Sequence, residues 1–172
     1  MTTSSLEIRA EIAADYPAVH ALNCAAFDTH AEARLVDHLR HSTAQHIALV
    51  AQSGEALLGY ILFTPVSLST APQLSIMGLA PMAVQPDQQG SGIGSLLVTA
   101  GLRCCAEAGA GAVVVLGHPG YYPRFGFLPA SRFGLGCNYD VPDEVFMAQE
   151  LVAGYLAEAS GMISYHPDFD AV

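Results

Sequence analysis

Three glycines at alternate positions stand where a strand pattern gives way to a helix pattern. Gly90, Gly92 and Gly94 follow an apolar run over 77–84 that contains Pro81. A glycine loop that opens a helix presents backbone N–H groups to a ligand, and the helix dipole adds partial positive charge at the same place. The types and spacing of these residues therefore predict an anion-binding site.

Two other interpretations of this loop stay open. A dinucleotide-binding loop requires a third glycine where this chain has Ser95, and an acidic residue about 20 positions further on, at the end of the next strand. The next strand ends at Gly117 and His118, without an acid. A turn that binds nothing is the other interpretation, although three glycines before a helix are more than a turn requires.

The charged residues exclude several classes of protein. The formal net charge is −10, which argues against a nucleic-acid-binding or anionic membrane surface because phosphates require clustered Lys and Arg. All six basic residues are arginines. The absence of lysine excludes a Walker-type phosphate loop, a Schiff-base mechanism and a pyridoxal enzyme. Backbone N–H groups and one or two arginines would have to hold an anion.

The cysteines, histidines and termini indicate an ordinary intracellular protein. The 4 cysteines form no CxxC pair, which favours small buried side chains in a reducing compartment. Only His38 and His41 stand at metal-ligand spacing, on a helix face expected to be solvated, so we expect no metal. There is no apolar leader and no run of roughly 18 apolar residues. We therefore expect a cytoplasmic protein without a membrane span.

The hydrophobic pattern predicts one mixed α/β domain over 1–172, in the order β-α-α-β-β-β-α-β-α-β-β. Strands are expected at 5–10, 46–52, 56–68, 74–84, 112–116, 145–151 and 162–165. Helices are expected at about 15–27 with Asp15 as N-cap, from Thr29 or His30 onward, and from the glycine loop to about Gly109. Pro81 cannot donate to a ladder, which predicts a bulge or a parting of strands there.

Two helices have recognisable buried faces. On the second helix, the expected buried residues are Leu35, Val36 and Leu39, with Arg34, Asp37, His38 and Arg40 outside. On the third helix, the expected buried residues are Ile93, Leu96, Leu97, Ala100 and Cys104.

Three sequence motifs resemble those of the Gcn5-related N-acetyltransferases, the GNAT superfamily. The stretch 89–94 (QGSGIG) resembles the family's Q/R-x-x-G-x-G/A signature, and 79–84 (LAPMAV) looks like its LxPLAV strand. Further on, 122–127 (YPRFGF) looks like its Y-x-x-x-G-F element. The element YYPRFGF and the ending SYHPDF are similar to a bacterial subgroup of acetyltransferases with unassigned substrates. The resemblance covers nearly the whole chain.

The resemblance implies a fold and a cofactor. The fold would be a mostly antiparallel sheet of about seven strands flanked by helices, with strands four and five parting to form a cleft for acetyl-CoA. The pyrophosphate would bind at Gln89, Gly90, Ser91, Gly92, Ile93, Gly94 and Ser95. The pantetheine arm would pair with backbone groups of Met82, Ala83 and Val84, where a backbone N–H can stabilise the oxyanion.

The resemblance also implies direct transfer from the thioester to an amine, which requires a proton for the leaving thiolate and a base for the amine. Tyr122 matches the family's general acid, although it could merely pack on the coenzyme. The base is open, because no acid lies between Ser69 and Val84. His118 is the leading candidate, with a coenzyme or loop contact as its alternative, and Glu150 is a weaker one.

The remaining residues define further expectations. Asp28, His30 and Glu32 are expected near the acceptor pocket, with Glu150 as another contact. Arg124 either reaches a coenzyme phosphate or forms a structural ion pair. The expected reaction is acetyl transfer to a primary amine of a small molecule or peptide, and the alternatives are a non-catalytic acyl-CoA sensor and a different acyl group. The apolar C-terminal strands could pair across a homodimer.

Overall fold

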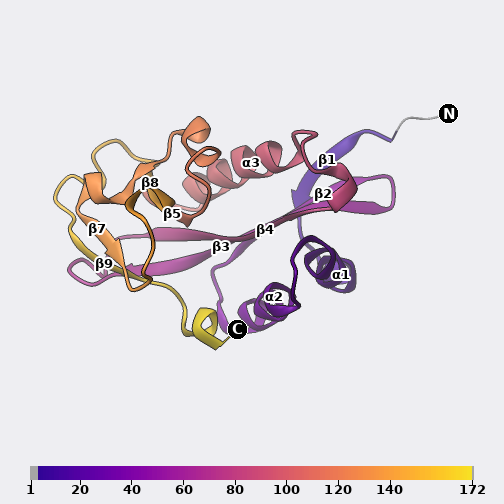
Figure 1. Cartoon of the computed structure of the whole chain (residues 1–172), viewed down its shortest axis with the longest axis horizontal. Helices are drawn as coiled ribbons and strands as arrows, with labels where there is room; N and C mark the ends of the chain where they lie inside the picture. The colour runs from indigo at the N-terminus through magenta and orange to yellow at the C-terminus, as the bar shows by residue number, and fades with distance from the viewer. Residues whose placement is uncertain (1–3, 172) are drawn as a thin grey trace. The chain divides into compact units, whose positions relative to one another are not determined.

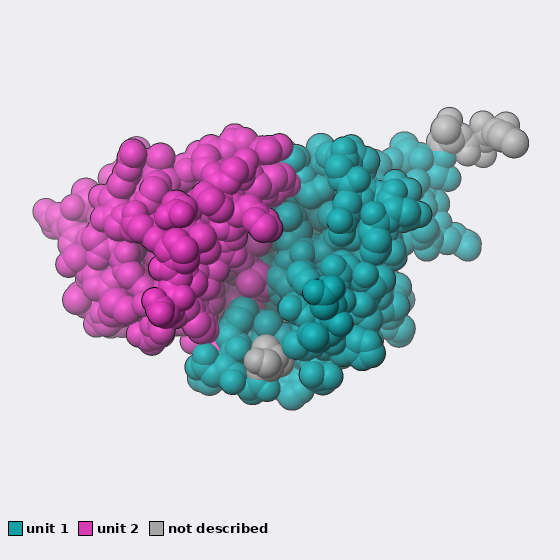
Figure 2. All heavy atoms as spheres, viewed as in Figure 1, with its two compact units in different colours: residues 1–63, 81–101, 167–172 teal, residues 64–80, 102–166 magenta. Residues whose placement is uncertain are grey.

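The computed structural model describes residues 4–171, which hold nine strands and three α-helices (Figure 1). The strands are β1 Leu6–Ala10, β2 Ile47–Ser53, β3 Ala56–Leu68, β4 Ile76–Val84, β5 Ala112–Leu116, β6 Leu128–Pro129, β7 Leu135–Cys137, β8 Phe146–Glu150 and β9 Gly161–Ser164. The helices are α1 Tyr16–Ala26, α2 Ala31–Ser42 and α3 Ile93–Glu107. The chain divides into two compact units, which Figure 2 colours separately.

The strands form an open sheet in the order β1-β2-β3-β4-β5-β8-β6. The pairs β1–β2, β2–β3, β5–β8 and β6–β8 are antiparallel, while β4–β5 is parallel. Strand β9 pairs antiparallel with β3 and parallel with β7. The mixed α/β fold with a mostly antiparallel sheet is thus confirmed. The sheet has two more strands than expected, β6 and β7, which are only two and three residues long.

Unit 1 contains residues 1–63, 81–101 and 167–172. Helices α1 and α2 lie side by side on one face of its strands (Figure 1). On β3, Tyr60 and Leu62 belong to the core against these helices, as expected from the alternation of side chains along a strand. Phe63 lies on the opposite face against Gly101 of α3, where a Cβ atom would stand 2.2 Å from Phe63 Cε2. The glycine therefore allows α3 to approach β3 closely.

The predicted buried face of α3 is partly wrong. Leu96 is 50% exposed, whereas Leu97 and Val98 are fully buried. The close contact at Gly101 fixes the rotation of the helix, and Leu97 lies one turn before it on the same side. Leu96 consequently faces outward, because consecutive helical residues are about 100° apart.

Arg40 corrects the expected outer face of α2. Its side chain is only 6% exposed and donates to Glu11 Oε1 at 2.5 Å, while Glu11 is 4% exposed. A second donor reaches Asp37 Oδ1 at 3.0 Å, and the guanidinium lies 3.7 Å from the centre of the Tyr16 ring. The other oxygen of Asp37 lies 2.7 Å from His20 Nδ1 and accepts a hydrogen bond when that nitrogen carries a proton. Helical spacing predicts an exposed arginine, but Arg40 is buried and its ion pair joins α2 to Glu11, the residue after β1.

Asp15 precedes α1 as predicted, but its carboxylate does not cap that helix. It accepts two hydrogen bonds from Arg9, at 2.7 and 2.9 Å, and one from the Ile12 N–H at 2.8 Å. The short 3₁₀ turn Ala13–Asp15 before α1 places the carboxylate there. The residue closes the connection between β1 and α1 instead of satisfying the first N–H groups of the helix.

Unit 2 contains residues 64–80 and 102–166. Its central strand β5 has the predicted bounds and is buried over Ala112–Val115, as expected for a strand covered on both faces. The segment after β5 was expected to be a Gly-rich loop to about Gly136, although the expected element order has a helix between this strand and the next, and the structure has no α-helix in this described part of the chain. It forms two 3₁₀ turns, Tyr122–Phe125 and Ala130–Phe133, separated by β6. Prolines and glycines in this segment prevent a continuous α-helix.

Candidate functional site

The glycine loop lies in unit 1 between the 3₁₀ turn Pro86–Gln88 and α3. Gly90 and Gly92 have φ angles of 81° and 93°, which side chains rarely tolerate. A Cβ atom on either glycine would meet no heavy atom within 4 Å, so the loop opens to free space. The N–H of Leu96 donates to Gly92 C=O at 3.1 Å and forms the first helical turn. The open loop and the N–H groups of a helix start together suit an anion.

Two side chains hold this loop in place. Ser91 Oγ donates to Gln88 C=O at 2.5 Å, and Gln89 Nε2 donates to Val84 C=O at 3.2 Å. The glutamine of the predicted signature therefore ties the loop to the end of β4. It also uses one acceptor position of the Val84 carbonyl.

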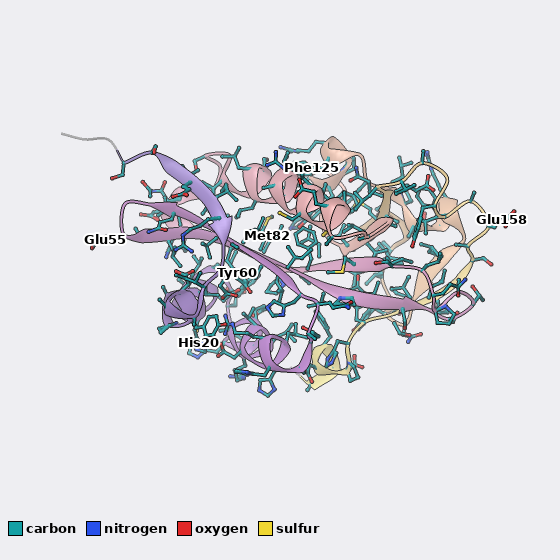
Figure 3. The ribbon with its side chains drawn as sticks, turned by 180° about the vertical axis from the view of Figure 1, so that it is seen from behind. His20, Glu55, Tyr60, Met82, Phe125 and Glu158 are labelled. Carbon is teal, nitrogen blue, oxygen red and sulfur yellow. The ribbon has the colours of Figure 1, made fainter. Side chains whose placement is uncertain are left out.

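The end of β4 is arranged as the motif predicts. Ala83 is buried in the core against α1 and α2, so Met82 and Val84 belong to the opposite face of the strand. Figure 3 shows Met82 on the side of the sheet that α3 covers. The recorded β4–β5 ladder joins Ile76–Leu79 to Ala112–Val115 and stops before Pro81. The pairing thus ends where the proline predicts it, which leaves the following residues of β4 without a recorded β5 partner among residues 4–171.

Tyr122 lies in unit 2 and is only 7% exposed. It begins the turn Tyr122–Phe125, and its N–H donates to His118 C=O at 3.3 Å. Three aromatic rings surround its ring, those of Tyr121 at 5.1 Å, Phe127 at 5.7 Å and Phe125 at 6.5 Å between centroids. Burial, with a smaller effect of Tyr121, raises the pKa of Tyr122 to about 12. The hydroxyl is therefore protonated at neutral pH.

The structure distinguishes the other predicted residues of unit 2. His118 follows β5 and is exposed, and its carbonyl accepts from both Tyr121 and Tyr122. Arg124 donates from Nε to Tyr121 C=O at 3.0 Å, and its guanidinium lies 4.6 Å from the centre of the Tyr121 ring. Within the described residues its recorded partners include no carboxylate, so the ion-pair alternative has no support there. Glu150 Oε2 accepts from the Leu156 N–H at 2.8 Å, which is a structural role.

The residues expected near the acceptor lie in unit 1, on the connection between α1 and α2. Asp28 and His30 are exposed, and His30 C=O accepts from the Arg34 N–H at 3.0 Å as α2 begins. Glu32 lies in the first turn of α2 and is half-buried. The predicted residues thus fall into two sets, one in each unit.

The sequence interpretation missed the environment of Tyr122. A Cβ atom on Gly117 would clash with its ring, and the ring of Tyr121 packs against both that ring and the Arg124 guanidinium. The only signal in the sequence was a glycine directly after an apolar strand, which has many structural explanations.

Two features are absent from the part of the chain that the structure describes, a group of metal-binding side chains and a membrane-spanning helix. Among residues 4–171, no three His, Cys, Asp or Glu side chains are grouped so that they could hold a metal ion. No helix in that part of the chain has both the length and the apolar character needed to cross a membrane.

Comparison with known proteins adds a second line of evidence. A family model described as an acetyltransferase (GNAT) domain matches residues 7–130. The uncharacterized N-acetyltransferase YhbS of Escherichia coli K12 is 37% identical over 164 residues, covering 95% of this chain and 98% of that protein.

Solved structures agree with this relationship. The crystal structure of YhbS in complex with CoA has a TM-score of 0.92 at 34% identity, covering 99% of this chain and 94% of the other. A GNAT family acetyltransferase of Brucella melitensis in complex with acetyl-CoA has a TM-score of 0.80 at 31% identity, covering 97% and 99%. The family model spans most of the chain and these relatives span nearly all of it, so the chain belongs to the GNAT family and is an N-acetyltransferase.

Proposed function

We propose that this chain transfers an acetyl group from acetyl-CoA directly to a primary amine. The observation that carries the proposal is the open glycine loop at the start of α3, where Gly90 and Gly92 leave the backbone uncovered. Residues 89–95 bind the pyrophosphate through backbone N–H groups. Residues 82–84 pair with the pantetheine arm as an added strand would. The complexes of the two relatives with CoA and acetyl-CoA support this cofactor.

Tyr122 is the proposed proton donor in this reaction. The amine nitrogen attacks the thioester carbon, the C–S bond breaks, and the Tyr122 hydroxyl gives its proton to the departing sulfur. A thiol has a reference pKa near 8.5 and a phenol near 10, so the thiolate is the weaker base of the two. Burial raises the pKa of Tyr122 further above that of a thiol, which keeps its hydroxyl protonated and makes the transfer depend on placing that hydroxyl beside the departing sulfur.

The proton released by the amine goes to a base, for which His118 is the proposed residue. An imidazole can accept and release a proton in the physiological pH range, and His118 lies on an exposed segment four residues before Tyr122. The carboxylate of Glu150 already accepts the Leu156 N–H, which makes it the weaker candidate. Asp28, His30 and Glu150 are proposed acceptor contacts, and Arg124 is a proposed coenzyme contact. A homodimer through the C-terminal strands and a cytoplasmic location remain parts of the proposal.

A thiol-release assay with acetyl-CoA and a panel of primary amines tests the function. We expect turnover with at least one amine, and we expect acetyl-CoA to raise the melting temperature. A melting shift without turnover on any amine would instead identify a coenzyme-binding module. Turnover with succinyl-CoA or longer acyl-CoA but not acetyl-CoA would correct the acyl group.

The variant Tyr122→Phe tests the proton donor. We expect kcat to fall about 10–10³-fold, in the range of general acid–base groups, with little change in coenzyme affinity. Tyr155→Phe is the control, because the hydroxyl of Tyr155 accepts the Ser75 N–H in a structural role. An unchanged kcat for Tyr122→Phe would remove this residue from proton transfer.

A further inference from the structure

Gly117 lies directly against the ring of the proposed proton donor. A Cβ atom on Gly117 would stand 2.3 Å from Cε2 and 2.7 Å from Cδ2 of Tyr122. Gly117 is not among the glycines with positive φ, so other residues could adopt its backbone conformation. The position therefore requires a glycine because the Tyr122 ring leaves no room for a side chain there, and not because of its backbone conformation.

Aromatic neighbours restrict the directions in which the Tyr122 ring can move. The edge of Tyr121 meets it at an interplanar angle of 85°, and Phe127 meets it at 81°. The backbone at Gly117 is also held in place, since its N–H donates to Val145 C=O at 3.0 Å. Because ordinary carbon contacts begin near 3.5 Å, a methyl group at Gly117 would displace the ring by about 1 Å.

We propose that Gly117 is a positioning residue that, together with the edge of Tyr121, fixes the ring of Tyr122 where its hydroxyl reaches the leaving sulfur. The inference rests on the proposed function of Tyr122 as proton donor. Catalytic groups tolerate little displacement, and a misplacement of about 1 Å can lower a rate about 10²-fold. Gly117 affects the reaction only through the position of Tyr122 and does not itself contact the reacting atoms.

Two other glycines of unit 2 supply matched controls. Gly120 lies in the same loop without positive φ, and a Cβ atom there would meet no heavy atom within 4 Å. Gly111 also lacks positive φ, and a Cβ atom there would stand 2.3 Å from Cε2 of Tyr155. Gly120→Ala thus adds a methyl group without a clash, and Gly111→Ala adds the same clash at a tyrosine with a structural role.

The experiment measures kcat, the KM for acetyl-CoA and the melting temperature of Gly117→Ala and both controls. We expect Gly117→Ala to lower kcat about 10–10²-fold with the KM changed less than about twofold. Gly120→Ala should match the unmodified protein in all three measurements. Gly111→Ala should lower the melting temperature but keep kcat. In a Tyr122→Phe background, Gly117→Ala should produce little further loss of kcat, because the proton donor is already absent.

The outcomes separate the inference from the proposed function. If Tyr122→Phe keeps full kcat, the proton donor is wrong and the inference fails with it. If Tyr122→Phe loses activity but Gly117→Ala behaves as Gly120→Ala does, the inference alone fails. Equal losses of kcat from Gly117→Ala in the unmodified protein and in the Tyr122→Phe variant would also overturn it. Should Gly117→Ala not fold, Tyr121→Leu loosens the same ring from another side, and an unchanged kcat there would overturn the inference.

Discussion

Asp15 shows how a single buried carboxylate stabilises the connection into the first helix. Its two oxygens accept three hydrogen bonds, from the Arg9 guanidinium and from the Ile12 N–H. The Arg9 hydrogen bonds, helped by the Ile12 N–H and opposed by burial, hold the pKa of Asp15 below its usual value. The ionised carboxylate is thus preferred in the folded protein more than in the unfolded chain, which makes this residue a contributor to stability that depends on pH.

Asp15→Asn should therefore lower the free energy of unfolding at neutral pH. It should also make that free energy depend less on pH between pH 7 and pH 3. Because the folded pKa lies below the unfolded one, the contribution of Asp15 is present above about pH 4 and is lost as the pH falls through the folded pKa. We expect a loss of about 1–3 kcal/mol in the free energy of unfolding at pH 7, and a smaller loss at pH 3. Urea unfolding between pH 7 and pH 3 measures both. The exposed Asp140→Asn is the control, and an equal pH dependence in the two variants would contradict the expectation.

At the scale of elements, long strands and glycine-marked ends were predictable, and packing partners were not. The bounds of β3 and β5 agree with the sequence, because turn residues at 53–55 and Gly111 mark their starts. Strands β6 and β7 are too short to show alternation. The rotation of α3 depends on Gly101 meeting Phe63, a contact between residues distant in the sequence. The burial of Arg40 depends in the same way on Glu11, which no spacing within α2 reveals.

In the candidate site, too, features of one continuous segment were predictable and contacts between distant residues were not. The glycine loop and the end of β4 were predictable because each is a continuous segment with a motif of its own. The close packing of Gly117 against the Tyr122 ring was not predictable, because it depends on where that ring lies in the folded chain. Local chemistry can be read from adjacent residues, whereas the fit between side chains distant in the sequence depends on the folded structure.

Gly92→Val tests the loop as an element. The substitution strains a residue with φ of 93° and places a branched side chain in the open space assigned to the pyrophosphate. We expect acetyl-CoA affinity to fall more than about 100-fold, because the backbone can no longer approach the ligand. Gly154→Val is the control, since Gly154 has φ of 78°, open space around its Cβ position and a place in another turn. Calorimetric titration with acetyl-CoA compares the two variants, and retained affinity in Gly92→Val would place the pyrophosphate elsewhere.

At the scale of the whole molecule, the negative net charge acts in opposite directions on the two substrates, the anionic coenzyme and the amine. The net charge of −10 repels an anionic coenzyme at long range, so its binding has to rely on short-range N–H groups at the start of α3. Part of the positive charge is also neutralised within the protein. Arg9 pairs with Asp15 and Arg40 pairs with Glu11 and Asp37. The same negative field attracts a cationic amine and raises its rate of encounter.

A cationic acceptor should consequently show a stronger dependence on salt than a neutral one. We expect kcat/KM for a primary amine carrying a second ammonium group to fall on the order of 10-fold as salt rises from about 0.01 to 0.3 M. A primary amine of similar size whose second group is an uncharged hydroxyl is the matched control, and its kcat/KM should fall much less. The assay holds acetyl-CoA at saturation, so that changes in coenzyme binding do not enter the comparison. Salt screens the field of the protein but leaves short-range contacts intact, and therefore equal losses for the two amines would show that the net charge does not select the acceptor.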